Sequence, residues 1–339
     1  TQPSAQQPLA DVKILEFSTM ITCAVAAMML SAQGAEVIKV EPPIMGDPGR
    51  LIGTQKNGLS AFFHNCNRGK RSLAIDLKTQ IGRDAVKRLA ADSDVLLHNY
   101  RPGVMDKLGL GSETLRASNE RLIYLGVSGF GTTGPMSDYP AYDMVIQGLT
   151  GITALQGSDN EMQHINMLVC DKITAYTVAQ ATTAALLARA STGKGQHIDI
   201  SMLQANLAFM WPDGMMDKTI EDRDGIVDMS PISDYYQTLD VSDGSIALAP
   251  LRDHHFKALL EMLGYPELLE DPRFNSMGGR LMHMDQVMEV LKNPRKEYTI
   301  AEAMSLLTAA DIPCAPCIAR DDLKAHAQIE AIEALETYE

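Results

Sequence analysis

The sequence predicts an α/β protein: a doubly wound parallel sheet forms the large domain, and a smaller α+β domain follows. Short β-branched runs alternate with helical patterns in the first half, and a long Ala- and Leu-rich segment comes next. Near residue 222 the composition shifts to Asp, Gly, Pro and Ser. Because 339 residues exceed what one small core needs, we expect a large domain at 1–220, a small domain at 221–320 and a helical segment at 321–339.

The alternation of strands and helices begins near the N-terminus. Residues 12–17 read as a strand, 24–33 as a helix ended by Gly34, and 36–40 as a second strand, which together make a βαβ unit. Further strands are expected at 72–76, 94–98, 122–127, 197–200 and 244–250, with helices at 81–92, 104–108, 171–190, from 202, and at 254–263.

Composition restricts the class of protein. Hydrophobic residues make up 45% of the chain and charged residues 21%, which is typical of a globular protein. A net charge of −14 argues against nucleic acid or an anionic membrane as partner. We see no secretory signal and no apolar run of membrane-span length, and the five scattered cysteines favour a reducing compartment. We therefore expect a cytoplasmic protein.

Two motifs suggest cofactors that their context does not support. Gly129, Gly131 and Gly134 form a G-x-G-x-x-G, but Pro135–Asp138 continue as loop where a dinucleotide site needs a helix. Cys314 and Cys317 lack a second pair, and flanking prolines predict a rigid loop. His254 and His255 are adjacent, so they are not an i, i+4 metal pair, and we expect them on the surface. No metal site is predicted.

Polar and basic segments adjoin several predicted strands. Asn67–Ser72 places three cations before a strand, which fits either a binding loop or a solvated turn. Asn99–Gly103 follows a strand, and loops at the carboxyl ends of parallel strands face the ligand crevice. Methionines cluster from Met202 onward; adaptable packing is the simpler interpretation, and an acyl pocket is the alternative.

Asp171 lies between the apolar run 165–170 and the predicted long helix. The position suits N-capping, which is the favoured role from chemistry alone. A partly desolvated carboxylate at a helix start also suits a nucleophile or a base, and both roles stay open.

In order along the chain, these motifs resemble the class III CoA-transferase family, which includes formyl-CoA and carnitine CoA-transferases and the related α-methylacyl-CoA racemases. The runs that carry the resemblance are PLADVKILEF at 8–17, GAEVIKVEP at 34–42, NRGKRS at 67–72, NYRPGVM at 99–105, SGFG at 128–131 and TGKGQ at 192–196. Six runs in register are specific, and the likeness covers nearly the whole chain. It implies that coenzyme A, as substrate and product, is the only cofactor.

The resemblance also assigns residues to the CoA site. By this likeness CoA is contacted by Met20, Ile21 and Thr22 at the pantetheine and acyl end, by Ile75 and Lys78 near adenine, and by Asn99, Tyr100, Arg101 and Lys107 near adenosine and phosphates, with Met202 toward the acyl group. Pro42 stands where formyl-CoA transferase has a phosphate-binding base, and Arg50 or Arg101 is expected to substitute.

The resemblance makes Asp171 the catalytic aspartate. In the transferases it attacks the thioester, forms an aspartyl anhydride and then an aspartyl-CoA thioester, and passes CoA to a carboxylic acid. In the racemases an equivalent Asp works with a His, which is Tyr142 here, followed by Asp143. A tyrosine has too high a pKa for that shuttle at neutral pH, so transfer is favoured over racemisation, and non-catalytic acyl-CoA binding is the third alternative.

Family members form interlocked homodimers, and the resemblance implies the same here. In that architecture the C-terminal segment returns to the large domain. This chain stops at Glu339, before such a return would finish.

Overall fold

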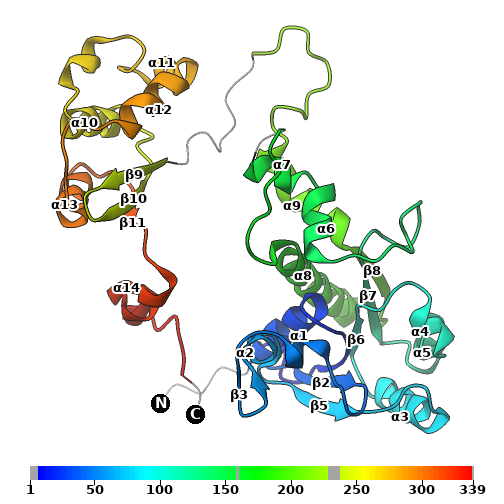
Figure 1. The fold of residues 1–339 in the computed structure, drawn as a ribbon. Helices are drawn as coiled ribbons and strands as arrows, with labels where there is room; N and C mark the ends of the chain where they lie inside the picture. Colours follow the sequence, from blue (N-terminus) through cyan, green and yellow to red (C-terminus); the bar gives the residue numbers. More distant parts are fainter. Residues whose placement is uncertain (1–6, 158–159, 228–236, 338–339) are drawn as a thin grey trace. The chain divides into compact units, whose positions relative to one another are not determined.

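The computed structural model describes residues 7–157, 160–227 and 237–337. The chain divides into two compact units, Thr1–Gly214 and Met215–Glu339. Figure 1 shows each unit with its own sheet and its own helices. Each unit is described by itself below.

The large unit contains a six-stranded sheet in which every neighbouring pair is parallel. The strand order is β5-β2-β1-β6-β7-β8, so the chain builds outward from β1 in both directions. This order confirms the predicted doubly wound parallel sheet. The strands are β1 Lys13–Phe17, β2 Glu36–Glu41, β5 Arg71–Ala74, β6 Val95–His98, β7 Ile123–Ser128 and β8 His197–Ser201.

Helices connect these strands and cover the sheet (Figure 1). They are α1 Thr22–Ala32, α2 Ala61–Asn67, α3 Gln80–Ala91, α4 Val104–Lys107, α5 Ser112–Ser118, α6 Asp143–Leu149, α7 Ile152–Gln156, α8 Val169–Thr192 and α9 Met202–Gly214. A short 3₁₀ helix, Pro48–Leu51, and the hairpin of β3 Gln55–Lys56 and β4 Leu59–Ser60 follow β2. Helix α1 packs on α8, which places the loop after β1 beside the long helix.

Local sequence shows where the long helix α8 begins and ends. Gly193 adopts φ 73° and terminates α8, a conformation that glycine adopts without strain. At the other end, α8 begins at Val169 and its N-cap is Leu168. Asp171 is therefore the third residue of the helix, and the expectation that it caps the helix is wrong. Cys170, which precedes it, is already buried in the first turn, so the helical apolar pattern starts earlier than predicted.

The glycine motif after β7 confirms the prediction that no helix follows it. No helix occurs in the described chain between β7 and α6, which begins at Asp143. Gly129 is required for close approach, because a Cβ there would lie 2.2 Å from the Cβ of Ala141. The motif thus packs one loop on another and forms no dinucleotide fingerprint.

The small unit has an antiparallel sheet in the order β11-β10-β9, covered by helices around a core centred on Phe256 and Leu260. Its strands are β9 Gln237–Val241, β10 Gly244–Leu248 and β11 Cys314–Pro316. Its helices are α10 Asp253–Leu263, α11 Met277–Met282, α12 Met284–Lys292, α13 Ile300–Ala309 and α14 Ala327–Ala331, with 3₁₀ turns at Pro266–Glu270 and Arg320–Ala325.

Two expectations about the small unit are wrong. Cys314 was expected in a rigid loop, but it lies in β11 and pairs with Leu248 of β10. Pro316 is tolerated in β11 because this strand is at the edge of the sheet. His255 was expected on the surface, yet only 3% of it is exposed, because the first turn of α10 directs it inward. Among the described helices of the chain, none is long and apolar enough to cross a membrane.

Candidate active site

Asp171 is a carboxylate with an unusually high proton affinity. It lies in the first turn of α8 and is partly buried. Burial, followed by the nearby charge of Asp143, raises the pKa of Asp171 to about 7, and Lys172 opposes this only in part. A carboxylate that titrates near neutral pH is more basic than an ordinary aspartate, so it is a better nucleophile once it is ionised.

Asp143 fixes the backbone at Asp171. Its Oδ2 accepts a hydrogen bond from the backbone N–H of Asp171 at 2.9 Å, and its Oδ1 accepts one from Gln147 Nε2 at 2.6 Å. Only 1% of Asp143 is exposed. Gln147 also accepts from the backbone N–H of Ile165 at 2.9 Å, which ties the segment before α8 to α6. Because the backbone N–H of Asp171 already donates to Asp143, it does not serve as an oxyanion donor.

Tyr142 precedes Asp143 and is the N-cap residue of α6. Its side chain makes no capping hydrogen bond, and 65% of the residue is exposed. Within the large unit, therefore, Asp143 is held against the backbone of Asp171 while Tyr142 faces outward.

The loop after β1 reaches the start of α8. Met20 and Ile21 pack with Cys66 and with Leu168, the N-cap residue of α8. Burial chiefly raises the pKa of the Cys66 thiol; the charge of Asp47 adds to this, and the charge of Asp171 makes the smallest contribution, which is a second sign that Asp171 lies nearby. The structure thus brings the predicted pantetheine loop next to the predicted catalytic carboxylate.

Met20 has φ 65°, a left-handed conformation that is uncommon for a residue with a side chain. Asp47 Oδ1 holds it by accepting from the Met20 N–H at 3.1 Å. On the other side, Asn99 accepts from the Thr19 N–H and donates to the Thr19 carbonyl and to Thr22 Oγ1. The Asn99 amide and the Thr22 hydroxyl therefore support the loop, and their polar atoms are already engaged.

A buried charge cluster beneath this loop was missed by sequence reasoning. Lys39 contacts Glu16 at 2.7 Å and Asp47 at 2.9 Å, and Lys70 contacts Glu16 at 2.7 Å. Burial disfavours the Glu16 carboxylate, but Lys70 and Lys39 outweigh it and keep the pKa of Glu16 below its usual value. The available signal was a charge in the middle of two apolar strands, Glu16 in β1 and Lys39 in β2.

The residues predicted to bind adenine and phosphates lie at or beyond the carboxyl ends of β5 and β6. Ile75 and Tyr100 pack against one hydrophobic cluster. Burial raises the pKa of Tyr100, so its hydroxyl stays protonated and can donate. The exposed cations Lys78, Arg101 and Lys107 form no ion pair with any residue that the structure describes.

Arg50 and Arg101, the two expected substitutes for a base at Pro42, have different surroundings. Arg50 makes a bidentate pair with Glu41, at 2.8 and 2.7 Å, and lies over the Phe63 ring at 3.8 Å. Arg101 is exposed at the end of β6. The guanidinium of Arg101 is the more available of the two for a phosphate.

Met202 begins α9 directly after β8, and only 6% of it is exposed. Its carbonyl accepts from Asn206, which also donates to the carbonyl of Cys170 in α8. Met202 therefore lies in the packing between α9 and the first turn of α8.

The large unit therefore combines a doubly wound sheet, a loop held in a strained conformation at its carboxyl edge, and a basic carboxylate beside that loop. Such a combination is typical of an α/β enzyme whose ligands bind at the carboxyl edge of the sheet. A family model described as CoA-transferase family III matches residues 9–339. The chain belongs to this family, and it is a CoA-transferase.

Curated relatives with similar sequences agree with this assignment. A succinate–glutarate CoA-transferase from Agrobacterium fabrum is 30% identical, over 97% of this chain and 84% of its own length. A succinyl-CoA–D-citramalate CoA-transferase from Chloroflexus aurantiacus is 34% identical, over 91% of this chain and 77% of its own. These similarities support CoA transfer between an acyl-CoA and an acid, with CoA as a substrate.

Solved structures have the same fold. A CaiB/BaiF family protein from Brucella suis aligns with a TM-score of 0.82 at 34% identity, covering 96% of this chain and 88% of the other. Rv3272 from Mycobacterium tuberculosis aligns with a TM-score of 0.84 at 28% identity, with the same coverage of both chains.

Proposed function

We propose that this CoA-transferase moves CoA from an acyl-CoA to a free carboxylic acid through covalent intermediates on Asp171. The observation that carries the proposal is the carboxylate of Asp171, whose pKa is raised to about 7 and whose backbone is fixed by buried Asp143. Non-catalytic acyl-CoA binding gives no reason for this arrangement, because a residue with only a structural role in the first turn of α8 needs no raised pKa.

The covalent sequence begins when a carboxylate oxygen of Asp171 attacks the thioester carbonyl. The carbon–sulfur bond breaks and leaves CoA as a thiolate, with an acyl-aspartyl anhydride on the protein. The thiolate attacks the aspartyl carbonyl, releases the donor's acid and stores CoA as an aspartyl thioester. An incoming carboxylate then reverses these two steps and leaves as the new acyl-CoA.

The CoA substrate is bound, in this proposal, along the carboxyl edge of the sheet. Lys78, Arg101 and Lys107 supply charge for the phosphates, which explains how a chain of net charge −14 holds an anionic substrate. Met20 and Ile21 direct the pantetheine toward Asp171, since they pack beside the start of α8. Asn99 and Thr22 act by holding that loop.

We further propose short dicarboxylic acids as the substrate class. The two curated relatives described above are named for succinate, glutarate and D-citramalate, and an acetyl-CoA:oxalate CoA-transferase from Acetobacter aceti is 32% identical. The direct test is a panel of succinyl-CoA, acetyl-CoA and long-chain acyl-CoA donors against mono- and dicarboxylate acceptors. Turnover restricted to long-chain donors and monocarboxylates contradicts this class.

A homodimer, interlocked as the family resemblance implies, completes the proposal. The helices α6, α8 and α9, with the N-cap residue of α6, expose large apolar side chains that a monomer has no reason to present, namely Tyr142, Met144, Tyr176, Phe209 and Trp211. Light scattering coupled to size exclusion measures the mass in solution. A mass of one chain at micromolar concentration contradicts the dimer.

The test of the mechanism is mass spectrometry after incubation with acyl-CoA and hydroxylamine. We expect an aspartyl hydroxamate at Asp171 in the native protein and no adduct or turnover in Asp171→Asn. Asp84→Asn, an exposed carboxyl on α3, is the matched control and retains both. Racemisation, the alternative, instead predicts solvent deuterium at the α-carbon without any acceptor acid. Full turnover of Asp171→Asn refutes both mechanisms.

A further inference from the structure

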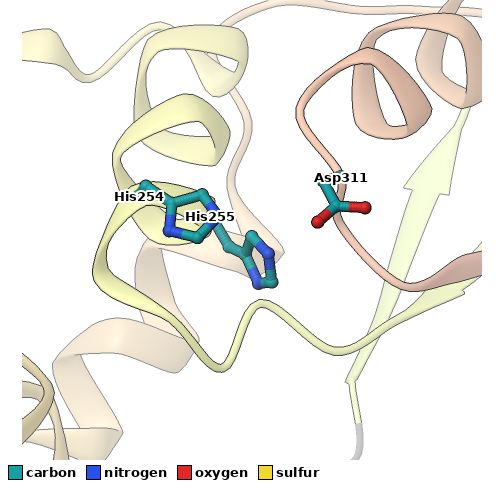
Figure 2. Close-up of side chains that lie close together, drawn as sticks. All are labelled: His254, His255 and Asp311. Atoms are coloured by element: carbon teal, nitrogen blue, oxygen red, sulfur yellow. The ribbon is translucent and has the colours of Figure 1, made fainter.

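In the small unit, α10 and the turn before β11 bring three potential metal ligands together. His254 and His255 lie in the first turn of α10, and Asp311 lies in the turn between α13 and β11. The ligand atoms of the three side chains all lie within 4.8 Å of one another, and among the described residues they are the group whose spacing suits a metal ion. In Figure 2 the His255 ring lies between His254 and the carboxylate of Asp311.

A second observation points to a ligand. Only 3% of His255 is exposed, and its Nε2 has no hydrogen-bond partner in the described chain. A buried polar atom without a partner is costly, and native proteins rarely retain one. Its position beside an exposed imidazole and an exposed carboxylate places this atom where a bound ion satisfies it.

The surroundings of the three side chains favour binding. The side chains of His254 and Asp311 have no hydrogen bond or ion pair with the described residues, so both can make the small movement that coordination needs.

The hydrogen bond at the other ring nitrogen of His255 determines which nitrogen carries the ring proton. Its Nδ1 accepts a hydrogen bond from the backbone N–H of Arg252 at 3.4 Å, near the outer limit for such a bond. Coordination through Nε2 requires the single ring proton to move to Nδ1, so this weak bond is given up. The metal–nitrogen bond at Nε2 replaces the lost hydrogen bond at Nδ1.

We propose that His254, His255 and Asp311 bind a divalent transition-metal ion of the zinc class, with water completing the coordination. Two imidazole nitrogens and one carboxylate oxygen suit Zn²⁺ better than Mg²⁺ or Ca²⁺, which prefer sets of oxygen ligands. The ion ties the N-terminus of α10 to the turn before β11. Asp311 has φ 58°, so this turn is a strained connection that such a tie stabilises.

The sequence alone gave no basis for this site, because adjacent histidines do not share a helix face. The third ligand arrives from a turn after α13, and the antiparallel pairing of β11 with β10 determines its position. The ordinary alternative is a histidine–aspartate pair in which Asp311 rotates toward Nε2 and no metal binds. A metal site binds Zn²⁺, whereas a histidine–aspartate pair alone does not.

The test uses the full chain, free of any histidine tag and stripped with a chelator. Calorimetric titration with Zn²⁺ is expected to show one ion per chain in the micromolar range or tighter, and Co²⁺ is expected to give a visible absorption spectrum. Zn²⁺ is also expected to raise the melting temperature. His254→Ala and Asp311→Asn weaken binding about tenfold or more.

Controls keep the outcome clear. Asn tolerates the left-handed conformation of residue 311, so Asp311→Asn tests the ligand and not the turn. His255→Gln preserves a polar side chain in the core, and if it fails to fold, the two exposed positions still decide the question. His283→Gln, an exposed histidine of the same unit, leaves binding unchanged. Absence of Zn²⁺ binding, or equal binding by every variant, overturns the proposal.

Discussion

Asp171→Asn is expected to make the protein more stable at pH 8 while it abolishes transfer. The pKa of Asp171 is about 7 in the folded chain, against about 3.9 for an aspartate in an unfolded one. Between these values the folded state holds a proton that the unfolded state has lost, so stability falls as pH rises, and above pH 7 the whole cost is present.

The size of the effect on stability follows from the difference between the folded and unfolded pKa values of Asp171. A carboxyl group shifted this far lowers the free energy of unfolding by ~4 kcal/mol at pH 8, and partial exposure of the side chain reduces this to ~2–3 kcal/mol. At pH 5 the folded group is protonated while the unfolded group is mostly ionised, and with the same reduction for exposure the cost is only ~1 kcal/mol. Asparagine carries no charge at either pH, so its advantage is expected to be larger at pH 8.

Urea denaturation of Asp171→Asn and of the native protein at pH 5 and pH 8 measures this difference. Asp84→Asn controls for the change in net charge and is expected to show no such pH dependence. A loss of ~1 kcal/mol in Asp171→Asn at both pH values, as expected for a carboxylate that only interacts with the dipole of α8, refutes the reasoning and favours a structural role for Asp171.

Three further predictions follow from the site. Asp143→Asn removes the second cause of the raised pKa of Asp171, so the rise of kcat/KM with pH is expected to move to lower pH; an unmoved profile contradicts the coupling. Arg101→Ala is expected to raise KM for acyl-CoA about tenfold with little change in kcat, while Arg88→Ala, an exposed cation on α3, changes neither; equal KM values in steady-state assays exclude a phosphate contact. Asp47→Ala takes one partner from the buried charge cluster and releases Met20, so we expect a loss of ~3–5 kcal/mol in denaturation; retention of native stability argues against the cluster as a support of the loop.

The sequence by itself determined the class of fold. Alternation of β-branched runs with helical patterns is a local property, and the strands at Lys13–Phe17, Glu36–Glu41 and Val95–His98 lie close to where it predicted them. Six ordered motifs also indicated the family, and two of them, at 99–105 and 128–131, begin where β6 and β7 end, at the carboxyl edge of the sheet where ligands bind.

Only the tertiary structure decided the chemistry of individual groups. Sequence placed Asp171 at a helix start, but its raised pKa depends on burial and on Asp143, which arrives from α6. The cluster of Glu16, Lys39, Asp47 and Lys70, and the group of His254, His255 and Asp311, likewise join residues from separate elements. Burial and Coulomb interactions depend on distances in space, which local sequence patterns do not encode.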